Sequence, residues 1–313
     1  MPREDLLLLR RGTRDQFNTS TANWLPGEMG EVTDEGKFVI ADRDGPTGDQ
    51  NFTTIGSTPN SAIRAYGEGA DAVANGTYLK AAYAAAKALT PNGLALSSTN
   101  RACVLVYPGR YDLVASTGTI GITLDTEFVD LIGVGARESI WITSVGWTVA
   151  QTANDVVIKG LTLESVSASF GDVAYFPNTN LPLTKMEDVN CVGVNNAYSH
   201  RRLVEFSGTF TNCVATGGYG GYGAFGGGGT ASGTFTNCVA GAYGFGSFTG
   251  SGGIFSGTAN NCTAGDKGFG GAGGTLSGQL YYCRLTSGNF ETVSTGGITR
   301  LCIDGNNAEN NQG

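Results

Sequence analysis

The chain has 313 residues, among them 50 Gly, 7 Cys and one His, and its formal net charge is −8. Only 15 % of the residues are charged, against about 25 % in an average soluble protein, which excludes a highly charged disordered chain. The negative balance argues against a nucleic-acid-binding protein, because phosphate contacts need a basic surface.

Nothing in the chain suggests a membrane segment or a secretory signal. No stretch approaches the roughly 18 apolar residues of a membrane-spanning helix. The apolar run Leu6–Leu9 is short, and Arg10 and Arg11 follow it rather than precede it. We therefore expect no membrane insertion, and assembly in a cytoplasm, where thiols stay reduced.

Residues 1–57 have a composition of their own, with more charge and with short strands separated by turn sequences. Three motifs stand out: LRRGT at Leu9–Thr13, PGEMG at Pro26–Gly30 and TDEGKF at Thr33–Phe38. Together they resemble the small N-terminal domain of phage receptor-binding proteins of the major tropism determinant type. The resemblance implies a β domain that holds a homotrimer together and attaches to other virion proteins. The nearby arginines could meet acidic partners there or form a solvated basic face.

The next segment, residues 58–100, is expected to be a linker and one short capping helix. Thr77–Leu89 is rich in Ala, Asn75 is a candidate N-cap, and Pro91 follows the helix. Cys103–Leu113 then predicts a buried strand, a Pro-Gly turn and a second strand. A helix over the open first coil of a solenoid would protect it from end-to-end aggregation.

A repeat runs through the second half of the chain. Of the 50 Gly, 28 lie between Gly208 and Gly297, and Cys recurs at intervals of 22, 25, 24, 21 and 19 residues. The repeated cysteines are Cys191, Cys213, Cys238, Cys262, Cys283 and Cys302, and a Phe follows three of them by seven residues, at Phe245, Phe269 and Phe290. A period of this length without a leucine-rich frame predicts a β-solenoid.

The interior of this solenoid follows from the spacing of Phe and Cys. Phe210 and Cys213 are three residues apart, so strict alternation would place them on opposite faces. A left-handed bend at Asn212, and likewise at Asn237, would bring both side chains inside. The cysteines would then stack as small buried residues. A disulfide suits stacked parallel side chains poorly, and zinc needs ligands that converge on one point.

Residues 61–302 resemble the right-handed parallel β-helix of the pectate-lyase-like superfamily, as used in phage tailspikes. The Ala-rich helix followed by VLVYPGRY carries this resemblance. The expected fold is therefore all-β: a small N-terminal β domain over residues 1–57, one capping helix within 58–100, and a right-handed parallel β-helix over 101–313.

Two groups of residues are candidates for chemistry. Asp125 and Glu127 would share one face of a strand, with Cα atoms about 6.6 Å apart, which suits a pair of glycosidase carboxylates. The alternative is a solvated outer face. Tyr219, Tyr222, Tyr243 and Phe248 lie in Gly-rich segments and could form platforms for sugar rings, or could pack against a neighbouring coil or subunit.

These observations predict a fibre or spike protein on a phage-type virion that adheres to host surface polysaccharide as a homotrimer. The rival functions are a polysaccharide depolymerase that uses Asp125 and Glu127, and a capsid decoration protein without a ligand. The scarcity of acidic residues in the repeats favours adhesion. We expect no metal and no cofactor, because the pectate-lyase calcium cluster has no counterpart in this sequence.

Overall fold

The computed structural model describes residues 10–12, 23–24, 29–32, 37–41, 45–46, 52–57, 61–67, 71–114, 119–166, 172–175, 181, 183–193, 196–199, 205–206, 208–217, 230–241, 245, 254–265, 268–269, 275–287, 297–304 and 309–312. The chain divides into two compact units. Residues 1–61 with 90–94 form the first, and residues 62–89 with 95–313 form the second.

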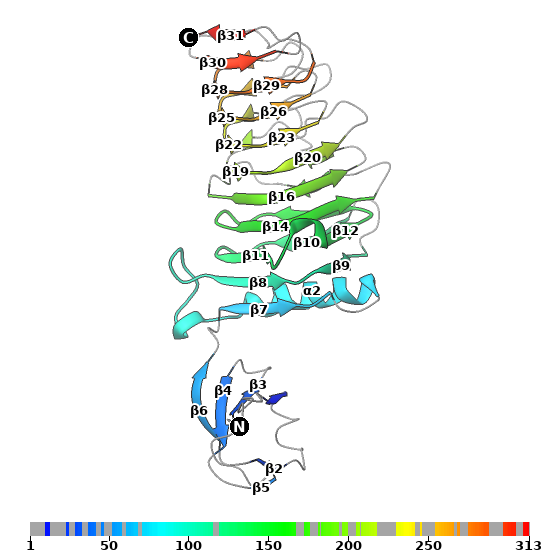
Figure 1. Ribbon diagram of the computed structural model, residues 1–313, viewed down its shortest axis with the longest axis vertical. Coiled ribbons are helices and arrows are strands. Elements are labelled where there is room, and N and C mark those ends of the chain that lie inside the picture. The colour runs from blue at the N-terminus through cyan, green and yellow to red at the C-terminus, as the bar shows by residue number, and fades with distance from the viewer. Residues whose placement is uncertain are drawn as a thin grey trace, which may run out of the picture. The chain divides into compact units, whose positions relative to one another are not determined.

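The first unit is built of short strands (Figure 1). These are β1 (Arg10–Gly12), β2 (Asn23–Trp24), β3 (Met29–Val32), β4 (Lys37–Ala41), β5 (Gly45–Pro46) and β6 (Phe52–Ser57), and the unit also holds the 3₁₀ turn η2 (Pro91–Gly93). Strand β3 pairs in parallel with β1 and antiparallel with β4, β4 pairs with β6, and β2 pairs with β5. The described part of residues 1–57 therefore consists of short β-strands, as expected, whereas its role in attachment and trimerisation stays a prediction.

The second unit is a parallel β-solenoid with one α-helix, as predicted (Figure 1). One ladder runs through β7 (Ala62–Ala65), β8 (Ala102–Val106), β11 (Val129–Gly133), β14 (Val157–Ser165), β16 (Lys185–Gly193), β19 (Thr209–Thr211), β22 (Thr234–Thr236), β25 (Thr258–Asn260), β28 (Gln279–Tyr281) and β30 (Ile298–Ile303). Because β7 pairs with β8, the sheet begins at residue 62; the expected boundaries at residues 57 and 100 stay predictions.

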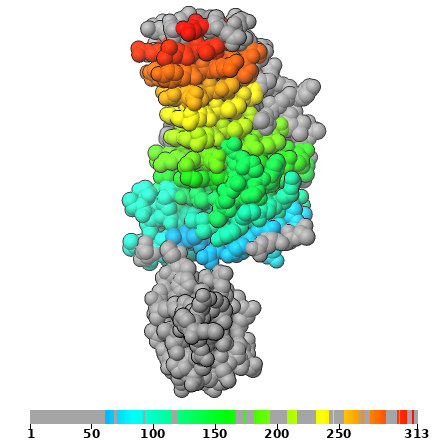
Figure 2. Space-filling view, in the orientation of Figure 1, coloured from blue at the N-terminus to red at the C-terminus, as the bar shows by residue number. Residues whose placement is uncertain are grey.

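Two further walls complete each coil. The second contains β9 (Gly109–Asp112), β12 (Ile140–Ser144), β20 (Val214–Gly217), β23 (Val239–Ala240), β26 (Thr263–Ala264) and β29 (Arg284–Leu285), joined by the later residues of β14, β16 and β30. Among the described residues, the third wall is divided between two sheets that do not pair with each other. One contains β10 (Ile120–Leu124), β13 (Trp147–Gln151), β15 (Asp172–Tyr175) and β17 (Asn196–Ser199), and the other contains β18 (Glu205–Phe206), β21 (Thr230–Ala231), β24 (Ile254–Phe255) and β27 (Thr275–Leu276). Strand β31 (Glu309–Gln312) pairs antiparallel with β30. The space-filling view shows the coils as successive bands of colour (Figure 2).

The helix α2 spans Ala72–Ala86 and packs against β7, β8 and β9 at the first coil. The predicted cap at Asn75 is wrong. Asp71 is the N-cap, and its carboxylate accepts hydrogen bonds from the amides of Val73 and Ala74. Asn75 is buried inside the helix, where its side chain donates to the carbonyls of Gly67 and Arg110. Among the described residues, no helix is long and apolar enough to cross a membrane.

One backbone position in each of the later coils has a left-handed conformation. Asn212 and Asn237 have φ of 54° and 52°, as the spacing of Phe and Cys predicts, and Asn261 repeats the conformation with φ of 51°. The register places these residues in one column, which we call the turn column; its other members are Gly160, Asp188, Tyr282 and Leu301. The left-handed conformation costs roughly 1–2 kcal/mol in most residues and less in Asn, whose side chain can hydrogen-bond locally.

This bend turns both Phe and Cys into the interior. Phe210 and Cys213 are fully buried on either side of Asn212, and Phe235 and Cys238 repeat the arrangement. The Phe210 and Phe235 rings stack at 5.1 Å, and those of Phe245 and Phe269 stack at 4.9 Å. Phe290, the third member of the predicted Phe series, lies outside the described residues.

Five thiols form a ladder along the interior, as predicted: Cys213, Cys238, Cys262, Cys283 and Cys302. All seven cysteines are free. The Cys238 thiol donates to the carbonyls of Phe210 and Thr236 at 3.4 Å, and the other members repeat the second of these contacts. Hydrogen bonds between neighbouring thiols raise the pKa of Cys238 and Cys283 and lower that of Cys262 and Cys302, so the inertness of the ladder rests on its burial. We therefore interpret the five ladder thiols as unreactive packing groups of the core.

Cys191 does not belong to this ladder, although the sequence spacing includes it. It pairs with Ala215, whereas Val189 occupies the ladder position beside Cys213. Spacing alone could not distinguish the two positions, because both point inward and differ by two residues.

Thiol reactivity tests this interior. In the folded protein we expect an aromatic disulfide reagent to modify at most one thiol, that of half-buried Cys103, and to modify all seven in concentrated guanidinium chloride. Even Cys103 should react slowly, because burial and the Asp130 carboxylate raise its pKa. Rapid modification of two or more thiols in the folded protein would contradict the ladder.

Candidate functional site

The predicted carboxylate pair does not lie on a strand. Strand β10 ends at Leu124, and Asp125 and Glu127 lie in the turn that leads to β11. The alternation that placed both carboxylates on one strand face therefore does not apply to them. Both residues are exposed. Their assignment as catalytic residues stays a prediction without its original geometric basis.

Asp125 connects the solenoid to α2. Its Oδ2 lies 2.9 Å from Lys87 Nζ, and its Oδ1 accepts a hydrogen bond from the Tyr83 hydroxyl at 3.3 Å. The same hydroxyl accepts hydrogen bonds from the amides of Asp125 and Thr126. Burial raises the pKa of Tyr83 to about 12, so the phenol stays protonated. Through these contacts Asp125 holds the C-terminal end of α2 against the solenoid.

The electrostatics of Asp125 disfavour a role as general acid. Burial alone would raise its pKa, but the hydrogen bond and charge of Lys87 outweigh that effect and lower it. A carboxyl group that donates a proton near neutral pH needs a raised pKa. Near neutral pH, Asp125 is therefore ionised, whereas a general acid must be protonated. Among the described residues, Glu127 makes no ion pair.

The four aromatic candidates, Tyr219, Tyr222, Tyr243 and Phe248, lie outside the described residues, as does the single histidine, His200. Their strand context is described only in part: β20 ends at Gly217 and β21 begins at Thr230. Their proposed role in glycan binding stays a prediction.

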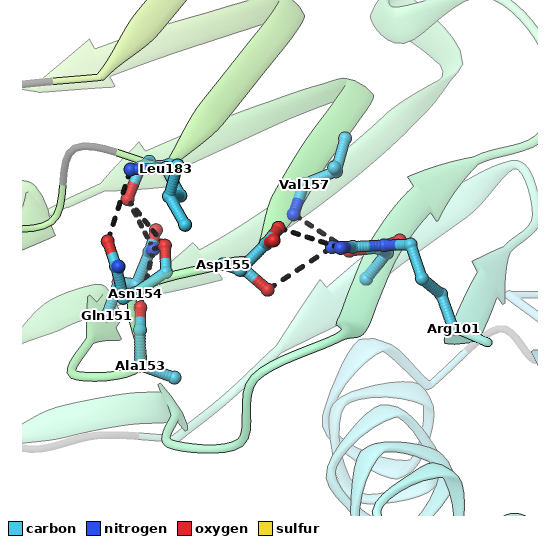
Figure 3. Close-up of polar contacts among 9 residues, drawn as sticks. Arg101, Gln151, Ala153, Asn154, Asp155, Val157 and Leu183 are labelled. Atoms are coloured by element: carbon cyan, nitrogen blue, oxygen red, sulfur yellow. Dashed lines mark hydrogen bonds and ion pairs between the residues drawn. The ribbon is translucent and has the colours of Figure 1, made fainter. Parts of the chain in front are cut away.

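Sequence reasoning missed a charged cluster on the first coils (Figure 3). Arg101 binds Asp130 through Nε and Nη2 at 2.8 and 2.6 Å, and its Nη1 binds Asp155 at 2.7 Å. Asp130 also accepts a hydrogen bond from the amide of Val157. The hydrogen bond with Asp130 raises the pKa of Arg101 further. The sequence signal for this cluster is that the three charged residues lie about one coil length apart, which places them at neighbouring positions of successive coils.

The ion pairs of the Arg101 cluster connect successive coils and do not form a reactive centre. One guanidinium is ion-paired with both carboxylates, and the three side chains are only 23 %, 11 % and 14 % exposed. A second polar network nearby fixes the turn after β13: Gln151 donates to the carbonyl of Ala153 and to Thr184 Oγ1, and Asn154 accepts from the amide of Leu183 (Figure 3). These groups hold one another in place and leave no free acid–base pair.

The outer surface of the later coils carries short, neutral side chains in register. Thr211, Thr236 and Asn260 form one column, and Asn212, Asn237 and Asn261 form the turn column beside it. The asparagine amides connect successive coils, from Asn237 to Asn212 at 3.2 Å and from Asn261 to Asn237 at 2.9 Å. Thr209, Thr234 and Thr258 add a third column. This surface offers hydroxyl and amide groups at a repeat of about 4.8 Å.

No group of three or more His, Cys, Asp or Glu side chains in the described part of the chain is placed to hold a metal ion. The described residues between 208 and 303 include no acidic side chain.

The stability of the folded protein should depend on Asp125 in a pH-dependent way. Because its folded pKa is lowered, Asp125 stabilises the fold above its unfolded pKa of about 3.9, and this contribution disappears as pH falls through the folded value. We expect Asp125→Asn to cost less than about 1 kcal/mol at neutral pH, as for an exposed ion pair, and nothing below the folded pKa. Urea unfolding at several pH values measures this. Glu127→Gln is the matched control, and an equal loss in both variants would contradict the assignment.

No protein-family model and no curated protein matches the chain. Its structure is similar to that of Geobacillus virus E2 ORF18, with 12 % sequence identity and a TM-score of 0.42 over 95 % of this chain and 69 % of that one. A pectin methylesterase from carrot is similar at 15 % identity and a TM-score of 0.41, over 80 % and 70 % of the two chains. The Dettilon tailspike protein is similar at 11 % identity and a TM-score of 0.35, over 77 % of this chain and 49 % of its own. Similarity at this level concerns the β-helix architecture and carries no information about activity.

Proposed function

We propose that this chain is a fibre or spike protein of a phage-type virion that adheres to host surface polysaccharide without cleaving it. The observation that carries the proposal is the outer surface of the later coils. Its Thr and Asn columns present hydroxyl and amide groups in a fixed register, and such groups exchange hydrogen bonds with sugar hydroxyls.

The interior supports this use of the surface. A ladder of buried cysteines, with stacked Phe pairs beside it, holds each later coil against the next, so the outer columns are kept in register before any ligand arrives. A preorganised surface loses little side-chain entropy when it binds. Several copies on one particle would add avidity to weak single contacts.

The N-terminal unit supports attachment to the particle. Its LRRGT segment contributes β1, and its TDEGKF segment contains the connection from β3 to β4. The sequence resemblance of this unit implies a homotrimer bound to other virion proteins. The C-terminal solenoid then remains available to the host surface.

Adhesion is favoured over hydrolysis by the surroundings of the acidic residues. Asp125 is engaged with Lys87 and Tyr83, and Asp130 and Asp155 are engaged with Arg101. A glycosidase needs two carboxyl groups that can act on opposite sides of one bond. Asp125, Asp130 and Asp155 are instead used to join structural elements.

Binding and cleavage can be measured on the same sample. We expect the full-length protein to bind capsule or lipopolysaccharide of a susceptible host in biolayer interferometry and to release no new reducing ends. Asp125→Ala and Glu127→Ala should bind as well as the unmodified protein. Reducing ends that vanish in these two variants would replace adhesion with depolymerase activity, and the absence of any binding would favour a decoration protein.

The oligomeric state is a separate test of the N-terminal assignment. We expect light scattering at micromolar concentration to give about three times the chain mass of 32.3 kDa. Removal of residues 1–57 should weaken the trimer. A full-length monomer would contradict the assignment.

A further inference from the structure

The outer surface changes chemical character at the last two coils. In the strand column, Thr211, Thr236 and Asn260 are followed by Tyr281 and Arg300. In the turn column, the three asparagines are followed by Tyr282 and Leu301, and on the next wall Val239 and Thr263 are followed by Arg284 and Ile303. Tyrosine and arginine side chains, absent from these columns in the three preceding coils, thus enter the surface, and we call this region the terminal patch: Tyr281, Tyr282, Arg284, Arg300, Leu301 and Ile303.

Stability does not account for this change. Tyr282 and Leu301 have φ of 54° and 52°, a conformation that suits the asparagines of the preceding coils better than bulky side chains. Burial does not compensate, because the two residues are 59 % and 53 % exposed. Bulky side chains retained at strained, exposed positions point to a function at the surface.

The patch combines an aromatic surface with positive charge. The Tyr281 hydroxyl donates to Gln279 Oε1 at 3.1 Å, which orients the ring, and Tyr282 stands beside it. Arg284 and Arg300 are exposed, and neither forms an ion pair with a described residue. In a chain with a net charge of −8, these two guanidinium groups supply the positive charge of the patch, and Glu309 lies opposite Ile303 at its edge.

We propose that the terminal patch binds an anionic polysaccharide, with Tyr281 and Tyr282 against sugar rings and Arg284 and Arg300 on carboxylate or sulfate groups. Aromatic faces pack against sugar rings, and guanidinium groups recognise planar anions through paired hydrogen bonds. This inference rests on the proposed adhesion and narrows its ligand from polysaccharides in general to charged ones.

The patch is less suited to a second copy of this chain. In a two-fold dimer that used the patch as its seam, the patch would face itself, so the arginines of one copy would lie against those of the other and repel them. The patch is also continuous with the Thr and Asn columns through unbroken strand pairing. A linear polymer along these columns would contact both the neutral and the cationic parts.

The test uses the full-length protein and four probes: alginate for carboxylates, dextran sulfate for sulfates, neutral dextran, and a DNA duplex as an unrelated polyanion. We expect alginate or dextran sulfate to bind more tightly than dextran and DNA. Arg284→Gln with Arg300→Gln should weaken that binding roughly tenfold or more, because charge-assisted hydrogen bonds are lost. Tyr282→Asn should weaken it as well while leaving the melting temperature unchanged or higher, which separates ligand binding from folding.

Lys80→Gln is the matched control, because Lys80 is exposed on α2, outside the Thr and Asn columns, and carries the same charge. It should bind like the unmodified protein. Equal binding by the patch variants, or DNA binding as tight as that of alginate and dextran sulfate, would overturn the inference. A change in solution mass in the patch variants would overturn it in favour of a protein interface. Binding of neutral host polysaccharide alone would overturn it and leave the adhesion proposal standing, whereas binding of no host polysaccharide would overturn both.

Discussion

The left-handed residue between two short strands of each later coil is the constraint on which the solenoid depends. Without it, the three-residue spacing of Phe210 and Cys213 would send one of them to solvent. With it, both are buried, and the parallel ladders on either side stay in register from coil to coil. The asparagine amides that connect Asn212, Asn237 and Asn261 stabilise the same position from outside.

The first and the later coils of the solenoid are held together by different interactions. The first coils are joined by ion pairs, with Arg101 between Asp130 and Asp155 and with Arg137 on Asp188, and Lys87 joins the helix to Asp125. In the later coils, aromatic stacking and buried thiols hold successive coils together instead of ion pairs. Among the described residues, the outer columns of these coils contain no acidic side chain. The acids are thus concentrated where they hold coils together, and the neutral surface lies where adhesion is proposed.

The repeat period, the inward-facing Phe and Cys, and the bend at Asn were predictable because each depends on residues within one coil. The N-cap of α2 was not, since Asn75 lies inside the helix and is buried against Gly67 and Arg110, a contact with residues far along the chain. The same holds for Cys191, whose place beside Ala215 rather than Cys213 is set by the pairing of whole strands.

The sequence by itself determined the architecture, because a solenoid repeats one local pattern and each repeat contacts mainly its neighbours. Only the tertiary structure decided what the charged and exposed residues do. Asp125 could be placed beside Lys87 only once α2 was docked on the first coil, and Tyr281 and Arg300 became neighbours only through the register of β28 and β30. Contacts between coils join residues about twenty positions apart, which no alternation within one strand can specify.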